Sequence, residues 1–208
     1  MENFEKLDEN KRNRIINSAM KEFALNGYSK ASTVNIARDA DIAKGALFYY
    51  FGNKNEMFRY LFLNAVEIME DKIYGILPKE RTPFIKLMRL ITDAKLSMTR
   101  EYPLISQFMS RAYMDEVSTE DDIKKKYEEI IARFFTYVSE YSDMSDIRED
   151  LSFTELMNIV SWISEGYAKQ LMDNMSYDGR TPDESETETI KKISDECLSL
   201  IERLITKN

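Results

Sequence analysis

The sequence predicts an all-α protein, and three observations support this fold class. Only 6 Gly and 4 Pro interrupt the 208 residues, whereas residues that favour helices, such as Leu, Ile, Met, Lys and Glu, are abundant. Apolar residues recur at three- and four-residue steps, the period of an amphipathic helix. Capping residues precede several of these segments. We expect about nine helices, arranged as an N-terminal three-helix domain (residues 1–54) and a larger helical domain (residues 55–208).

The first domain is expected to hold helices at residues 8–26, 32–40 and 43–51. Asp8 and Ser32 are suitable N-caps for the first two. Gly27 supplies a left-handed stop after the first, and a four-residue turn centred on Asp41 and Ile42 separates the second from the third. The inward-facing apolar residues of the first two helices are Ile15, Ile16, Ala19, Met20, Phe23, Ile36, Ala37 and Ala40. Two short helices joined by such a turn are typical of a helix-turn-helix.

The second domain begins with a long helix, capped by Asn53 and Glu56 and ended by Pro78 after Leu77. Five further helices are expected from Thr82–Pro83, from Pro103 to about Met114, from Ser118 to about Tyr141, from Ser152 to about Met175, and from Thr181 to about Thr206. Ser152 with Glu155, and Thr181 and Pro182 with Glu184, are the expected start signals of the last two.

The charge is divided unevenly between the two predicted domains. Residues 1–54 contain nine Lys or Arg against seven Asp or Glu, a balance of +2, within a chain of net charge −8. Residues 55–208 therefore carry −10. Contacts to DNA phosphates need positive charge only locally, so an acidic body with a mildly basic head is compatible with DNA binding.

The residues of the helix-turn-helix carry a specific resemblance. They are Ser32, Ile36-Ala37, Ala40-Asp41-Ile42-Ala43, Gly45, Leu47-Phe48, Tyr50-Phe51 and Lys54. On these residues, the segment from Lys11 to Met57 resembles the DNA-binding head of the Tet repressor (TetR) family of bacterial transcriptional regulators. Three positions depart from the family pattern, with Asp41 in place of Gly, Ala43 in place of Ser and Phe48 in place of Tyr. The resemblance implies a dimeric repressor that binds a palindromic double-stranded DNA operator and responds to a small molecule.

The outward residues of the predicted helix-turn-helix are candidates for DNA contact. Lys44 and Gly45 open the recognition helix, where free amides and the helix dipole favour phosphate or base acceptors. Gly45 and Ala46 lack bulk, so the helix can approach base edges closely. The complete set is Ser32, Thr33, Lys44, Gly45, Ala46, Phe48, Tyr49, Tyr50 and Lys54. Core packing remains the alternative for Phe48, Tyr49 and Tyr50, and Leu47 and Phe51 are expected in the core.

The last two helices carry apolar stripes that fit a dimer interface. The stripes comprise Leu156, Val160, Ile163, Tyr167 and Leu171, and Ile190, Ile193, Cys197, Leu200, Ile201 and Leu204. The family resemblance implies a four-helix bundle made by two copies. Packing of both stripes inside one chain is the alternative.

Aromatic and methionine residues between the head and these helices suggest an effector pocket. The candidates are Phe108, Met109, Tyr113, Phe134, Tyr137, Trp162 and Glu165. Such side chains suit a mainly apolar or aromatic ligand, although each could equally fill a core. Glu165 leaves a cationic ligand possible.

Composition argues against several other function classes. The chain has no His, the commonest general base and zinc ligand, so we expect neither an enzyme nor a metal or cofactor site. The single Cys and the absence of a long apolar run favour a cytoplasmic protein without a membrane segment. A DNA-bound adaptor controlled by a protein partner remains the alternative to a ligand-responsive repressor.

Overall fold

The structure is a computed structural model that describes residues 2–114, 121–174, 180 and 182–207. The chain divides into two compact units. Unit 1 comprises Met1–Asp71, Glu101–Lys125 and Tyr177–Thr181, and unit 2 comprises Lys72–Arg100, Lys126–Ser176 and Pro182–Asn208. The predicted all-α class is confirmed, because ten helices and only two strands of two residues make up the described part. Unit 1 extends beyond the predicted head, and the functional boundary at residue 54 stays a prediction.

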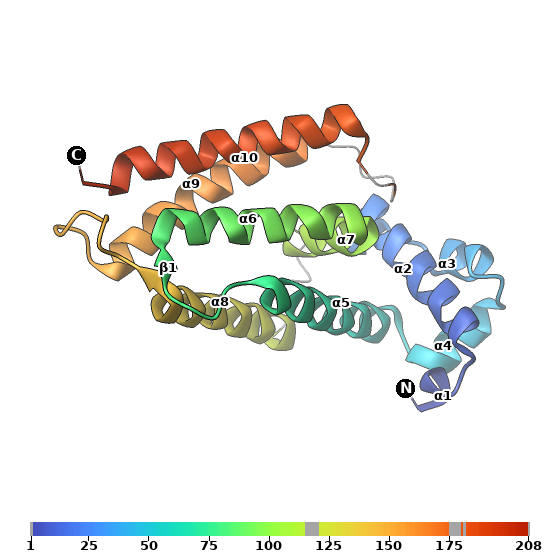
Figure 1. The fold of residues 1–208 in the computed structure, drawn as a ribbon. Coiled ribbons are helices and arrows are strands. Elements are labelled where there is room, and N and C mark those ends of the chain that lie inside the picture. The colour runs from blue at the N-terminus through green and yellow to red at the C-terminus, as the bar shows by residue number, and fades with distance from the viewer. Residues whose placement is uncertain (1, 115–120, 175–179, 181, 208) are drawn as a thin grey trace. The chain divides into compact units, whose positions relative to one another are not determined.

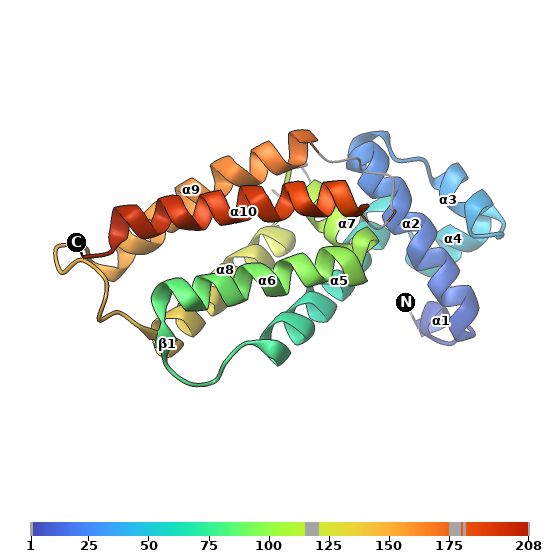
Figure 2. The same ribbon diagram turned by 45° about the horizontal axis from the view of Figure 1, so that its top comes forward.

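The helices of unit 1 are α1 (Glu2–Glu5), α2 (Glu9–Lys30), α3 (Thr33–Asp39), α4 (Lys44–Phe51), the first part of α5 (Lys54–Ile76) and α7 (Pro103–Met114). Helix α2 packs against both α3 and α7, and α3 packs against α4 (Figure 2). The rings of Phe23, Phe58 and Phe108 join α2, α5 and α7, with centroid separations of 5.1 Å and 5.2 Å on either side of Phe58. These aromatic contacts form a rigid support for the helix-turn-helix.

Most of the predicted helix boundaries in unit 1 are confirmed. The carboxylate of Asp8 accepts a hydrogen bond from the Lys11 amide at 2.9 Å, and Asn53 Oδ1 accepts one from the Glu56 amide at 2.8 Å. Gly27 has φ 69° and breaks the helical path of α2, although one more turn follows it to Lys30. Positive φ at this position is accessible to glycine at little cost.

Helix α1 is absent from the sequence prediction. Its Phe4 is fully buried, and the Phe4 ring lies 4.6 Å from that of Phe51 and 5.4 Å from that of Tyr60. A helix of four residues is too short to show a 3.6-residue period. Tertiary contact with α4 and α5 therefore defines this element.

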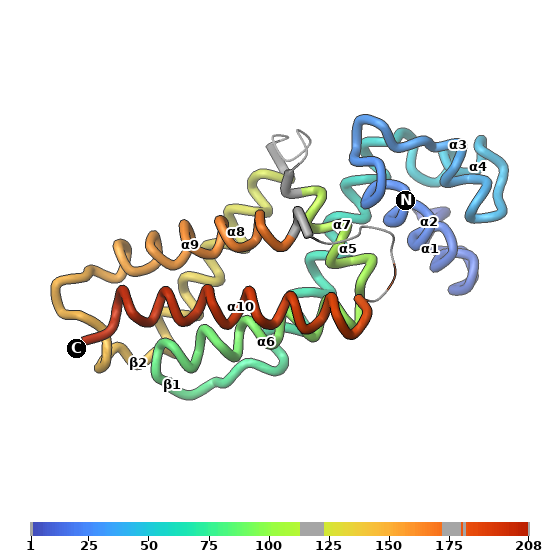
Figure 3. The backbone as a smooth tube through the Cα atoms, turned by 90° about the horizontal axis from the view of Figure 1, so that it is seen from above, coloured from blue at the N-terminus to red at the C-terminus, as the bar shows by residue number. Residues whose placement is uncertain are grey.

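Unit 2 contains the rest of α5 with α6 (Phe84–Glu101), most of α8 (Asp121–Tyr141), α9 (Phe153–Asn174) and α10 (Glu184–Ile205). Helices α9 and α10 lie side by side (Figures 1 and 3). The core of unit 2 includes Leu87, Val138, Leu156, Met157 and Ile201. Apolar residues from α6, α8, α9 and α10 are therefore buried against one another.

Two predicted helix starts in unit 2 are wrong. Thr82–Pro83 forms the strand β1, which pairs in parallel with β2 (Ser142–Asp143), and α6 begins only at Phe84. The last helix is capped by Asp183. The Asp183 carboxylate accepts a hydrogen bond from the Glu186 amide, and Glu186 accepts one from the Asp183 amide, both at 2.9 Å. The other predicted start signals, Ser118 and Thr181, lie outside the described residues.

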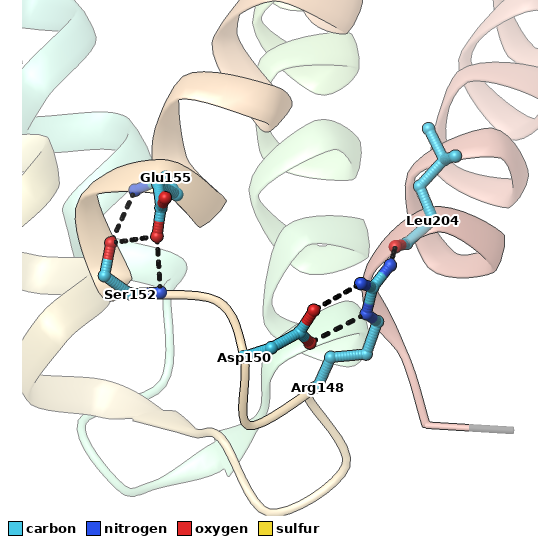
Figure 4. A network of polar contacts seen from close by, with 5 residues as sticks. All are labelled: Arg148, Asp150, Ser152, Glu155 and Leu204. Carbon is cyan, nitrogen blue, oxygen red and sulfur yellow. Dashed lines mark hydrogen bonds and ion pairs between the residues drawn. The ribbon is translucent and has the colours of Figure 1, made fainter.

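A network of polar contacts connects the loop before α9 to the end of α10 (Figure 4). Arg148 donates to Asp150 Oδ1 at 3.0 Å and to the carbonyl of Leu204 at 3.2 Å. The predicted capping box at the start of α9 is confirmed, since Ser152 and Glu155 exchange hydrogen bonds at 2.9 Å and 3.3 Å. These contacts hold the start of α9 and the end of α10 together.

None of the described helices has the length and apolar content that crossing a membrane would require.

Candidate DNA-binding surface

The turn between α3 and α4 sets the geometry of the helix-turn-helix. Asp41 has φ 55°, a left-handed conformation that Asp adopts more readily than most residues other than glycine. The amide of Ile42 donates to the carbonyl of Ala37 at 3.0 Å and closes the end of α3. At the start of α4, Ala43 stands at the capping position and offers no side-chain hydrogen bond. The amides at this end of α4 therefore lack a side-chain acceptor from the capping residue.

Helix α4 buries one face and exposes the other. Leu47 and Phe51 are 1% and 4% exposed, which confirms their predicted place in the core. Lys44, Gly45 and Tyr49 are exposed, Tyr49 by 67%. A Cβ atom at Gly45 would have no protein atom within 4 Å. Packing within the protein therefore does not require a glycine at this position. The absence of a side chain leaves open space in front of the helix.

The other aromatic residues of α4 divide between surface and packing. Phe48 is 37% exposed, and the Lys44 ammonium lies 5.9 Å from the centre of its ring. Tyr50 is half-buried, with ring centroids 5.7 Å from Tyr49 and 5.9 Å from Phe4. Tyr50 is thus oriented by Phe4, a residue that the sequence reasoning missed.

The start of α3 is held by a buried carboxylate. Ser32 caps α3 by accepting a hydrogen bond from the Asn35 amide at 3.3 Å. The Ser32 amide itself donates to Glu22 Oε1 at 2.8 Å, and Glu22 is only 9% exposed. Glu22 follows Ile15 and Ala19 on the apolar stripe of α2, at seven- and three-residue steps. An acidic residue on such a stripe was the sequence signal for this contact, and it was missed.

Lys54, at the first position of α5, lies against the last turn of α2. Its ammonium donates to the Ser29 carbonyl at 3.3 Å and lies 4.9 Å from the centre of the Tyr28 ring. Removal from water lowers the pKa of Lys54, and the negative charge of Glu22 partly offsets this effect. Thr33 is half-buried and the adjacent Val34 is 53% exposed. Val34 is a surface residue of α3 that the sequence reasoning did not select.

The predicted effector residues are distributed over both units. In unit 1, Phe108 is fully buried and Met109 is half-buried, while the side chain of Tyr113 lies outside the described residues. The remaining candidates belong to unit 2. The Tyr137 hydroxyl donates to the Pro78 carbonyl at 2.7 Å, and Trp162 is 68% exposed. Phe134 is half-buried and Glu165 is exposed.

The predicted dimer residues fall into two groups. Six are buried within unit 2, namely Leu156, Val160, Ile190, Ile193, Cys197 and Ile201. The other five keep accessible surface, namely Ile163, Tyr167, Leu171, Leu200 and Leu204, with Leu204 44% exposed. A groove of about 710 Å³ also runs over α10 beside Tyr167, lined by charged residues such as Lys192 and Glu196. The two stripes therefore contribute both to the core of one chain and to its surface.

No cluster of His, Cys, Asp and Glu side chains suited to a metal ion occurs among the described residues.

The chain is similar to known regulatory proteins in sequence and in fold. Residues 15–61 match the family described as "Bacterial regulatory proteins, tetR family". The repressor KstR of Rhodococcus jostii is 24% identical over 158 residues, which cover 74% of this chain and 73% of KstR. A TetR family transcriptional regulator from Chloroflexus aurantiacus has the same fold, with a TM-score of 0.77 at 21% identity over 100% of this chain and 99% of that one. FadR from Bacillus subtilis, solved with stearoyl-CoA, gives a TM-score of 0.59 at 18% identity over 90% and 96% of the two chains.

Proposed function

We propose that this chain, which belongs to the TetR family of bacterial regulatory proteins, represses transcription by binding a palindromic operator as a dimer and is released by a small molecule. The observation that carries DNA binding is the exposed end of α4. Lys44 supplies positive charge there, and Gly45 leaves the helix free to approach base edges. The buried residues Leu47 and Phe51 hold the same helix in place from behind.

The proposed binding mode assigns different roles to the contacts. Lys44, the amides at the start of α4 and the hydroxyls of Tyr49, Tyr50 and Thr33 would contact phosphates, which fix the position of the protein on DNA. Gly45 and Ala46 would face the base edges. Lys54 would reach a phosphate from the edge of the surface, where its ammonium now contacts Ser29 and Tyr28.

Selection of bound fragments from the source genome tests this proposal directly. The enriched fragment then serves as the probe in fluorescence anisotropy, with Lys44→Ala and Tyr50→Ala as variants. Both should lose specific binding while helicity is unchanged. Lys21→Ala is the matched control, because Lys21 is an exposed lysine of α2 that is not among the predicted DNA contacts. If no fragment is enriched, or if both variants bind like the unmodified protein, DNA recognition by this surface is wrong.

The dimer would form through α9 and α10. The accessible apolar residues of these helices, among them Leu204 and Leu200, would be covered by the same helices of a second copy. Two heads spaced by roughly 34–36 Å can then read the two halves of a palindrome. A lone head contacts too few base pairs for such recognition.

Sedimentation velocity of a Leu204→Glu variant tests the dimer. Leu204 is already accessible in the single chain, so the charge should separate the copies without unfolding them. Leu90→Glu, at another accessible leucine in unit 2, should leave the dimer intact. Sedimentation of the unmodified protein as a monomer would contradict the proposal.

Release by a small molecule is supported by the FadR neighbour, whose structure contains stearoyl-CoA. In our proposal the ligand binds in the helical body and changes the position of α5, which continues from unit 1 into unit 2. The ligand must bind the DNA-free arrangement more tightly than the DNA-bound one, because equal affinity for both would shift nothing.

A further inference from the structure

A lysine lies on the apolar face of α6. The buried residues of this helix within unit 2 are Phe84, Leu87, Met88, Ile91, Ala94 and Met98. Lys95 follows Ile91 by four residues and precedes Met98 by three, so it belongs to the same face. Lysine is among the residues least often found on such a face unless its charge is paired.

The contacts of Lys95 do not include a negative charge. Its ammonium lies 5.5 Å from the centre of the Phe134 ring on α8, a cation–π arrangement. Within the part of the chain that the structure describes, no carboxylate forms an ion pair with it. By contrast, Arg89 on the same helix pairs with Asp195 of α10 at 2.8 Å.

Lys95 is surrounded by protein but still has accessible surface. Removal of the ammonium from water lowers the pKa of Lys95, and no neighbouring charge offsets this effect, unlike the case of Lys54 and Glu22. The side chain nevertheless has a large accessible surface. A lysine that keeps accessible surface although protein surrounds it fits the wall of a recess better than an open surface.

We propose that Lys95 and Phe134 bind the charged end of the effector, and that this effector is an apolar molecule bearing a carboxylate. This inference rests on the proposed release by a small molecule. A carboxylate would supply the missing negative charge, and hydrogen bonds between charged groups are strong where water is excluded. The ring of Phe134, which is only half-buried, would contact the uncharged part of the molecule next to the carboxylate. Phe134 was among the predicted effector residues, whereas Lys95 was not.

Isothermal titration calorimetry with matched probe pairs tests the proposal without DNA. The pairs are dodecanoate with 1-dodecanol, and 2-naphthoate with 2-naphthylmethanol, which differ only in the charged end. At least one carboxylate should bind tenfold or more tightly than its alcohol, because a charge-assisted hydrogen bond contributes about 1.5–3 kcal/mol. Lys95→Met should remove this preference and leave the affinity for the alcohol unchanged.

A variant at the opposite face of α6 and a stability measurement serve as controls. Lys86→Met, at an exposed position, should keep the preference for the carboxylate. Lys95→Met should unfold at a temperature equal to or higher than the unmodified protein, because it removes an unpaired charge from an apolar face. In proteins whose lysines carry ¹³C-methyl labels, the signal missing from Lys95→Met identifies Lys95. Bound carboxylate should raise the pKa read from that signal.

The outcomes separate this inference from the proposed function. If Lys95→Met binds the carboxylate as tightly as the unmodified protein, or if no carboxylate is preferred to its alcohol, the inference is overturned. If the carboxylate binds through Lys95 but operator affinity does not change, release by this ligand fails while the binding site stands. If only uncharged compounds release the operator, the proposed function stands and the carboxylate site does not.

Discussion

Substitution of Gly45 by alanine should change stability and DNA binding in opposite directions. Gly45 is the second residue of α4, and an added Cβ would have no protein atom within 4 Å. Among the described residues, the glycines with positive φ are Gly27 and Gly52, and Gly45 is not one of them. The folded chain therefore accepts the added methyl group without strain.

The size of both effects follows from this geometry. Alanine is favoured over glycine inside a helix by roughly 0.5–1 kcal/mol, and the lower end applies close to the N-terminus of α4. We expect Gly45→Ala to raise the free energy of unfolding by about 0.5 kcal/mol. The same methyl group would hold α4 away from base edges, where hydrogen bonds require about 3 Å. Loss of the contacts to one base pair costs about 1–3 kcal/mol, a decrease in operator affinity of about 5- to 150-fold.

Two measurements test this prediction. Urea unfolding gives the stability change, and fluorescence anisotropy with the selected operator gives the change in affinity. Gly75→Ala is the matched control, because Gly75 lies on α5 and its Cβ position is also open. It should leave operator affinity unchanged. Operator binding by Gly45→Ala equal to that of the unmodified protein would refute the close approach of α4 to the bases.

Three further predictions concern the support of the DNA-binding surface. Phe4→Ala should lower the free energy of unfolding of the head by about 3 kcal/mol and weaken DNA binding, because the fully buried Phe4 ring orients Tyr50; unchanged urea unfolding would contradict this. Glu22→Ala should destabilise the protein by about 1–3 kcal/mol, whereas Glu22→Gln should cost less, since its carbonyl can still accept from the Ser32 amide; equal losses would contradict the hydrogen-bond role. Burial and the hydrogen bond to Glu5 raise the pKa of Tyr60 to about 12, against a small opposing effect of Arg12. Its stabilising contribution should be present below about pH 10 and be lost as pH rises through 12, so urea unfolding should show the difference from Tyr60→Phe shrinking over that range.

Local signals in the sequence predicted most of the helices. Asp8, Asn53 and Ser152 cap helices as predicted. Each side-chain oxygen accepts a hydrogen bond from the amide three residues later, so the signal is contained in a short stretch of sequence. Thr82–Pro83 was misassigned as a helix start because its strand pairs with Ser142–Asp143, about 60 residues later. No local pattern reports such a partner.

The candidate site was partly accessible to the same reasoning. The exposed positions Lys44, Gly45 and Tyr49 follow from the helical period once Leu47 and Phe51 are placed in the core. The residues that support this surface, Phe4 and Glu22, depend on contacts across the fold. Their roles could not be derived from spacing alone.

The sequence by itself determined the all-α class and the helix-turn-helix, because capping, helical period and the turn at Asp41 depend on residues close in the chain. Only the tertiary structure decided which apolar stripes are buried and which charges are left unpaired. The stripes of α9 and α10 divide between core and surface. Lys95 lies beside Phe134 without a carboxylate among the described residues. Both results depend on packing between helices distant in sequence, where burial and Coulomb interactions are set by distance in space.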